Sequence, residues 1–203
     1  MENDIIAIVM AAGKGTRMKS KNSKLVQKIY GKEIVKRAVE NAEKAGVKDI
    51  VAVVGYKKEE VMKVLGDNIK YAFQDEMLGT GHAVMQAKEY LKGKKGKVLV
   101  LNGDVPLIRP ETLNKLIEKS IENKEYATLL TAIYDDPTGY GRIVRDEGGN
   151  IEGIVEEKDT TEEQKKITEI NAGIYCFDIE ALLEALEKKK QELQKQHEQA
   201  KKD

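Results

Sequence analysis

Hydrophobic residues in this chain form short unbroken runs, separated by longer stretches in which apolar and polar positions repeat with helical spacing. The most apolar runs are rich in Val and Ile, and runs of this length and β-branched content predict buried strands. They span residues 5–10, 49–54 and 98–101, and a shorter run at 69–73, interrupted by Lys70, predicts one more strand. The intervening stretches predict helices over 32–45, 59–65 and 79–91 and one helix that begins at Pro110.

This alternation predicts an α/β fold with a three-layer, mostly parallel, Rossmann-like sheet and helices on both faces. Ligands of such sheets bind at the carboxyl ends of the strands. Three segments directly follow predicted strands, and we expect them to meet at that edge: 11–18, 74–81 and 102–104.

The second part of the chain has a different pattern. Shorter runs predict strands at 127–134 and 170–177, and a β-hairpin insertion around Gly148-Gly149 that pairs 142–144 with 151–156. From Glu180 onward there is no Gly or Pro, and the last ten residues are almost wholly polar. We therefore expect a main domain over 1–178 and a C-terminal helix over 179–203 that frays at its end.

Composition excludes several classes of function. Lys+Arg and Asp+Glu both number 35, so no net positive charge recruits nucleic acid. Cys176 is the single cysteine, which argues against disulfides and favours a cytoplasmic location. One cysteine and two histidines do not suffice for a typical zinc site. No apolar run approaches membrane-spanning length.

The segment after the first strand, AAGKGTRM at 11–18, predicts a phosphate-binding turn. Its small residues let the backbone approach a ligand, and Lys14, Arg17 and Lys24 supply positive charge for a polyphosphate. The spacing matches neither the phosphate loop of NTPases nor the three-glycine dinucleotide fingerprint. The alternative is an ordinary strand–helix turn with solvated lysines.

The other two segments offer a metal ligand and a base-reading edge. Asp104 closes the run VLVLNGD and is suited to magnesium beside phosphates, although turn and capping aspartates are common there. Gln74, Gly79 and Thr80 could read a planar base edge, or Thr80 could be a helix N-cap. His82 is interpreted as a partly exposed helix residue, and Cys176 as a core residue.

With these residues identified, the chain resembles sugar-phosphate nucleotidyltransferases. It is most similar to the N-terminal uridylyltransferase domain of the bifunctional uridylyltransferase/acetyltransferases that make UDP-N-acetylglucosamine in bacteria. The similarity covers residues 5 to about 185, in order. Its motifs are AAGKGTRM (11–18), Lys24, QDEMLGTGHA (74–83), LNGDVPL (101–107), PTGYGRIVR (137–145), GIVEEKD (153–159) and EINAGIY (169–175).

The resemblance implies Mg²⁺-dependent transfer of a uridylyl group from UTP to N-acetylglucosamine 1-phosphate. The products are pyrophosphate and UDP-N-acetylglucosamine, a precursor of peptidoglycan and the cell wall, and no covalent intermediate forms. The implied catalytic residues are Arg17, Lys24 and the metal ligand Asp104. The implied nucleotide-binding residues are Met10, Ala11, Ala12, Gly13, Gln74, Gly79, Thr80, Asn102 and Gly103, and the implied sugar-binding residues are Gly141, Glu156 and Asn171.

Some positions depart from the family pattern. Ser23, Gln27 and Glu33 stand where the family usually has Pro, His and Pro, which affects packing more than chemistry. The C-terminus also differs, and it implies that a second metal ligand, the acetyltransferase domain and its trimer are absent and that the chain is a monomer or weak dimer. Two alternatives therefore stay open: a sibling nucleotidyltransferase with other substrates, and a sugar-nucleotide-binding scaffold with little or no turnover.

Overall fold

The structure is a computed structural model that describes residues 4–15, 18 and 22–199, apart from the side chains of 193 and 196–199. The chain forms two compact units. Unit 1 comprises Met1–Thr128 and Cys176–Asp203, and unit 2 comprises Leu129–Tyr175. None of the helices in the described part of the chain has the length and apolar character needed to span a bilayer.

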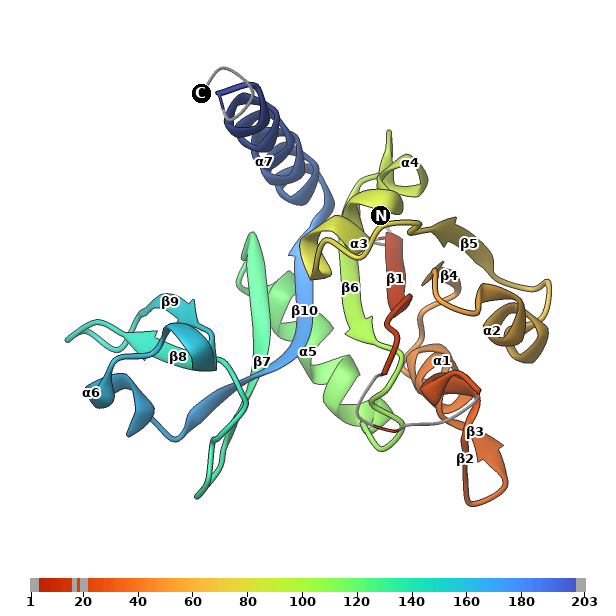
Figure 1. The fold of residues 1–203 in the computed structure, drawn as a ribbon, viewed down its shortest axis with the longest axis horizontal. Coiled ribbons are helices and arrows are strands. Elements are labelled where there is room, and N and C mark those ends of the chain that lie inside the picture. Colours follow the sequence, from red (N-terminus) through yellow and green to blue (C-terminus); the bar gives the residue numbers. More distant parts are fainter. Residues whose placement is uncertain (1–3, 16–17, 19–21, 200–203) are drawn as a thin grey trace. The chain divides into compact units, whose positions relative to one another are not determined.

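Unit 1 is built on parallel strands in the order β5-β4-β1-β6 (Figure 1). Their bounds are β1 Asp4–Ala11, β4 Asp49–Val54, β5 Lys70–Phe73 and β6 Gly96–Asn102. Met10 is in register with both Val53 and Asn102, so the carboxyl ends of the three inner strands lie level. β4 is buried from Ile50 to Val54, as its continuous apolar run predicts.

Helices pack around this sheet. They are α1 Ile34–Lys44, α2 Lys58–Leu65, α3 Thr80–Gln86, α4 Lys88–Leu91, α5 Pro110–Glu122 and α7 Ile179–Gln199. α1 contacts β1, α2 and α3 contact β4, and α5 and α7 contact β6. The predicted α/β class with a mostly parallel sheet is confirmed. Three of the predicted helices have different bounds, α2 by a single residue and the other two by more.

The helix predicted over 32–45 begins two residues late, because Lys32–Glu33 form a strand, β3, that pairs with β2, Lys28–Ile29. Tyr30 and Gly31 between them both have positive φ, at 49° and 77°, as in the two-residue turns that join hairpin strands. The helix predicted over 79–91 is interrupted at Ala87, which is fully buried. Neither Gly nor Pro marks that break, so it follows from packing and not from a local signal.

Unit 2 contains the predicted hairpin, formed by β8, Arg142–Arg145, and β9, Ile151–Val155, which pair antiparallel. β8 also pairs with β10, Glu169–Asp178, at Arg142 and Ile170. β10 and β7, Ala127–Ile133, each run across the boundary between the two units. Two short helices complete the unit: the 3₁₀ helix η3, Glu157–Asp159, and α6, Glu162–Lys165.

Candidate functional site

A cleft of about 400 Å³ opens in unit 1 at the carboxyl ends of the parallel strands. Its lining includes residues from all three segments that were expected to meet at this edge of the sheet. The lining residues are Met10, Ala12, Gly13, Gly15, Met18, Lys24, Leu25, Gln74, Met77, Gly79, Thr80, Ala83, Asn102 and Asp104. Arg17, an implied catalytic residue, lies outside the described residues.

The glycine-containing turn forms one wall of the cleft. Ala11 ends β1 in the core, and the carbonyl of Ala12 accepts a 3.1 Å hydrogen bond from the Tyr56 N–H. Among the described residues, none apart from the two neighbours of Gly13 has an atom within 4 Å of the position that a Cβ would take there, so this backbone is open to a ligand. Gly15 has φ +57°, and a Cβ there would lie 2.7 Å from Lys24 Cβ. Glycine at 15 therefore permits both the turn and the approach of Lys24.

Lys24 and Asp104 form an ion pair across the cleft, with 2.7 Å between Nζ and Oδ2. The two side chains are 30% and 39% exposed, so incoming ligands can reach both charges. Lys24 lies on the 3₁₀ turn η2, Lys24–Val26, and Asp104 follows the end of β6. A phosphate would compete for the ammonium group and a cation for the carboxylate, because each charge currently neutralises the other.

A network behind Lys24 fixes its turn. The Ser23 N–H donates a 2.8 Å hydrogen bond to Glu60 Oε2, and Ser23 Oγ accepts from the Leu25 N–H at 3.3 Å. The Ser23 N–H and then Lys57 hold the pKa of Glu60 below its usual range. A proline at position 23 could not make the bond to Glu60, because proline has no N–H.

Asp104 is held near the turn by its neighbour Gly103. The Gly103 N–H donates a 2.9 Å hydrogen bond to the Met10 carbonyl, which joins the ends of β6 and β1. A Cβ at Gly103 would lie 3.1 Å from that carbonyl oxygen and 3.3 Å from Val35 Cγ2. Glycine thus permits the close approach that brings Asp104 to the cleft.

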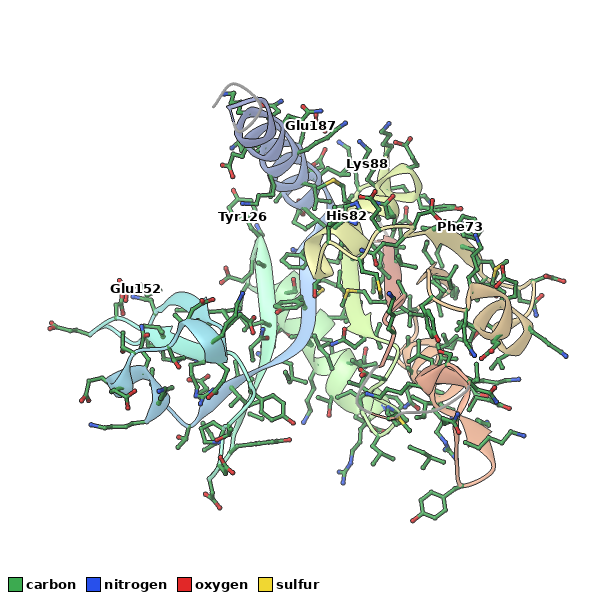
Figure 2. All side chains as sticks on the ribbon, viewed as in Figure 1. Phe73, His82, Lys88, Tyr126, Glu152 and Glu187 are labelled. Atoms are coloured by element: carbon green, nitrogen blue, oxygen red, sulfur yellow. The ribbon has the colours of Figure 1, made fainter. Side chains whose placement is uncertain are left out.

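Gln74 and the start of α3 form the opposite wall. Gln74 is 4% exposed, and its N–H donates to the Val54 carbonyl at 2.8 Å, which extends the pairing of β5 with β4. Its side-chain Nε2 lies 3.0 Å from His82 Nδ1 and 3.4 Å from the Gly79 carbonyl oxygen. Gly79, at φ +96°, occupies the N-cap position of α3, so Thr80 is the first helical residue and not the cap. Figure 2 shows His82 on α3 and Phe73, the residue before Gln74, on β5.

The sugar-binding candidates lie together in unit 2. The Asn171 N–H donates to the Gly141 carbonyl at 2.8 Å, and a Cβ at Gly141 would lie 3.5 Å from Glu156 Oε1. The side-chain amide of Asn171 donates to the Tyr175 hydroxyl at 2.7 Å.

The turn before Gly141 is tied to the rest of unit 2 by an ion pair between a buried arginine and a partly exposed glutamate. Arg142 is 1% exposed and pairs with Glu157 at 2.8 Å. The Gly139 N–H also donates to Glu157, and together with Arg142 it holds the pKa of that carboxyl below its usual range. Glu157 therefore holds this turn at two points, through the Gly139 N–H and through the Arg142 side chain.

The charged groups of the cleft suit a magnesium ion that is bound partly by substrate better than a metal ion whose ligands all come from the protein. Across the described parts of the chain, no three His, Cys, Asp or Glu side chains gather where they could hold a metal ion. Magnesium uses one or two carboxylates together with substrate phosphates and water. Asp104 provides one such carboxylate, and Asn102 belongs to the same lining. The donors present fit Mg²⁺ bound together with a phosphate ligand.

Sequence reasoning missed several residues that shape the cleft. Leu25 and Met77 line it, but their types signal nothing beyond packing. Gly55 directly follows β4, and a Cβ there would lie 2.6 Å from the Gln74 carbonyl oxygen and 3.0 Å from Ala12 Cβ. His82 is a partly exposed residue of α3, as interpreted, but its contacts with Gln74 and Gln86 were not predicted. Cys176 is fully buried, and burial raises the pKa of its thiol, as expected of a core residue.

The chain is similar to known proteins in both sequence and fold. The chain is 53% identical over 183 residues to the bifunctional protein GlmU of Caldanaerobacter subterraneus subsp. tengcongensis, and 51% identical over 181 residues to that of Clostridioides difficile. These matches cover 90% and 89% of this chain, which spans about 40% of the length of either relative.

A solved structure with the same fold is a putative glucose-1-phosphate thymidylyltransferase from Bacillus anthracis. Its TM-score is 0.72 at 22% identity, over 88% of this chain and 73% of that one. The family model for nucleotidyl transferases matches residues 6–202, nearly the whole chain. The chain therefore belongs to the nucleotidyl transferase family.

Proposed function

We propose that this chain transfers the uridylyl group of UTP to N-acetylglucosamine 1-phosphate, giving UDP-N-acetylglucosamine and pyrophosphate. The observation that carries the proposal is the composition of the unit 1 cleft. A bare glycine backbone and the Lys24–Asp104 pair lie in the same lining as Gln74, Gly79 and Thr80. The identity of about half of its residues to GlmU proteins supports the choice of nucleotide and sugar.

In the proposed reaction, a phosphate oxygen of the sugar phosphate attacks the α-phosphorus of UTP in line. The bond from that phosphorus to the pyrophosphate group breaks as the new P–O bond forms, so no protein nucleophile is needed. Lys24, together with Arg17, offsets the negative charge that develops on the phosphates. The backbone at Gly13 approaches the nucleotide, and Gln74, Gly79 and Thr80 bind the uracil.

Magnesium would be held by Asp104 and the phosphates of UTP, and when bound it would neutralise charge on those phosphates. Lys24 must release Asp104 for this to occur, and the triphosphate offers its ammonium group a replacement partner. Gly141, Glu156 and Asn171 of unit 2 are proposed to bind the amino-sugar phosphate. The cytoplasmic location and the monomer or weak dimer expected from the sequence remain predictions.

Pyrophosphate release tests this function. The reaction would contain UTP, N-acetylglucosamine 1-phosphate and Mg²⁺, with each omitted in turn. Release that needs all three is expected. Failure to release pyrophosphate with this pair, together with release from another nucleotide or glucose 1-phosphate, would show a sibling activity. Stabilisation by UDP-N-acetylglucosamine with no release from any pair would show a binding protein.

A further inference from the structure

Three side chains form a polar chain that leads from the wall of the cleft along α3. Gln74 Nε2 lies 3.0 Å from His82 Nδ1, and His82 Nε2 lies 3.0 Å from Gln86 Nε2. Gln86 Nε2 also lies 3.2 Å from the carbonyl oxygen of His82. Both ring nitrogens of His82 are therefore engaged, and one of them contacts a residue that lines the cleft.

The number of protons on the His82 ring limits how the hydrogen bonds of this polar chain of side chains can be arranged. A neutral imidazole has one N–H and one bare nitrogen, so it cannot accept hydrogen bonds from an amide nitrogen at both ends. One of the two glutamine amides must present its oxygen to the ring instead. The nitrogen and oxygen of a side-chain amide are nearly the same size, so the hydrogen-bond network determines which of them faces the ring.

Burial decides which of the two glutamine amides presents its oxygen to the His82 ring. Gln74 is 4% exposed, and with its nitrogen inward it satisfies both the Gly79 carbonyl and the bare Nδ1 of His82. If the Gln86 oxygen accepts from His82 Nε2–H instead, the Gln86 amide nitrogen gives up its 3.2 Å contact with the His82 carbonyl, but that carbonyl still accepts from the backbone of α3. Gln86 is only partly buried, so its nitrogen can be hydrated. Leaving a buried donor unpaired costs more than hydrating an accessible one. His82 therefore carries its proton on Nε2, and Gln74 keeps its nitrogen inward.

This arrangement determines what Gln74 can offer to a ligand. With Nε2 used by Gly79 and His82, the Oε1 of Gln74 is left to accept, and no group within the described ranges donates to it. Uracil presents an N–H between two carbonyls, whereas cytosine presents a bare ring nitrogen beside an amino group. An amide oxygen pairs with the N–H of uracil but meets a lone pair on the ring nitrogen of cytosine.

We propose that His82 is a positioning residue that selects uracil over cytosine, because its bare Nδ1 holds the Gln74 amide in one direction. Gln86 supports it by accepting the proton on Nε2. The inference rests on the proposed function, since it assigns the nucleotide preference of the same site. His82 itself need not touch the substrate.

The test compares the ratio of kcat/KM for UTP to that for CTP in four proteins, with N-acetylglucosamine 1-phosphate as the second substrate. They are the wild type, His82→Leu, His82→Asn and Met85→Leu. His82→Leu keeps an apolar side chain of similar reach but cannot accept from Gln74. His82→Asn restores an acceptor oxygen near the position of Nδ1. Met85→Leu is the matched control, because it changes α3 at a residue that lies in a separate cavity with Leu183.

The wild type should prefer UTP, and His82→Leu should lower the UTP-to-CTP ratio about tenfold, mainly through a higher KM for UTP. His82→Asn should keep the ratio within about threefold of the wild type, and Met85→Leu should leave it unchanged. A purely structural role would instead lower kcat for both nucleotides equally. A ratio in His82→Leu within about twofold of the wild type would overturn the proposal.

Failure of the proposed function would be visible separately, as a wild type that releases no pyrophosphate from UTP. The nucleotide preference would then be measured by calorimetry, as the ratio of the affinities of the four proteins for UDP and for CDP. A reduced preference for UDP in His82→Leu would support the role of His82 without turnover. An unchanged preference, or a wild type that binds neither nucleotide, would overturn it.

Discussion

Replacing Gly55 with alanine tests whether the junction between the glycine turn and Gln74 is as tightly packed as the structure indicates. The added Cβ would lie 2.6 Å from the Gln74 carbonyl oxygen and 3.0 Å from Ala12 Cβ. Ordinary contacts need about 3.4 Å or more, so the two walls of the junction must separate by about 0.8 Å. Both neighbours are anchored by backbone hydrogen bonds, Gln74 to Val54 and Ala12 to Tyr56, which limits how the strain can relax.

Overpacking of this kind costs about 1–3 kcal/mol, which for a chain of this length corresponds to a fall in Tm of about 2–12 °C. The same displacement moves Gln74, and a misplacement near 1 Å can lower kcat/KM about 100-fold. Thermal melting and UTP kinetics would measure both effects. Gly153→Ala is the matched control, because in the described part of the chain no residue beyond its two neighbours has an atom within 4 Å of its added Cβ. A Gly55→Ala protein with the Tm and UTP kinetics of the control would refute the reasoning.

Three further substitutions test other parts of the account. Gly13→Ala should leave Tm unchanged, because no described residue beyond its two neighbours lies within 4 Å of the added Cβ. The same substitution should lower UTP kcat/KM about tenfold, and unaltered kinetics would remove Gly13 from the site. Asp104→Asn should lower activity about 10²–10³-fold with little change in Tm, because its ion pair is partly exposed, and an unchanged Mg²⁺ titration would contradict its role. Burial raises the pKa of Asp49, but hydrogen bonds from Lys70 and Lys94 outweigh it and lower the pKa overall. Asp49→Asn should therefore cost about 1 kcal/mol at pH 7. The deficit should begin to shrink as the pH falls below about 4, where the unfolded carboxylate binds a proton, and it should vanish once the pH is below the lowered pKa of the folded carboxylate. A deficit independent of pH in thermal melts would contradict this.

Much of the sheet could be predicted because its strands are buried and have no competing pattern. The run at 49–54 matches β4 residue for residue, since continuous Val and Ile between polar flanks leave little choice of structure. The carboxyl-end rule also led to the cleft, because three loops that follow parallel strands must emerge at one edge.

What sequence reasoning missed depends on contacts between distant segments. The β2–β3 hairpin is polar and turns at Tyr30-Gly31 instead of the usual Asn-Gly, so no local signal marked it. The Lys24–Asp104 pair joins residues 80 positions apart, and the chain of Gln74, His82 and Gln86 requires the start of α3 to lie beside β5. Pattern alone identified the residue types but not these pairings.

The most direct test of the account is a crystal structure of the protein with UTP and Mg²⁺ in the absence of sugar phosphate. The account predicts the uracil beside Gln74 and Thr80, the phosphates at Gly13, and Lys24 separated from Asp104. UTP bound elsewhere, for example in the cavity lined by Asp4, Lys48 and Lys94 at the opposite ends of the strands, would contradict it.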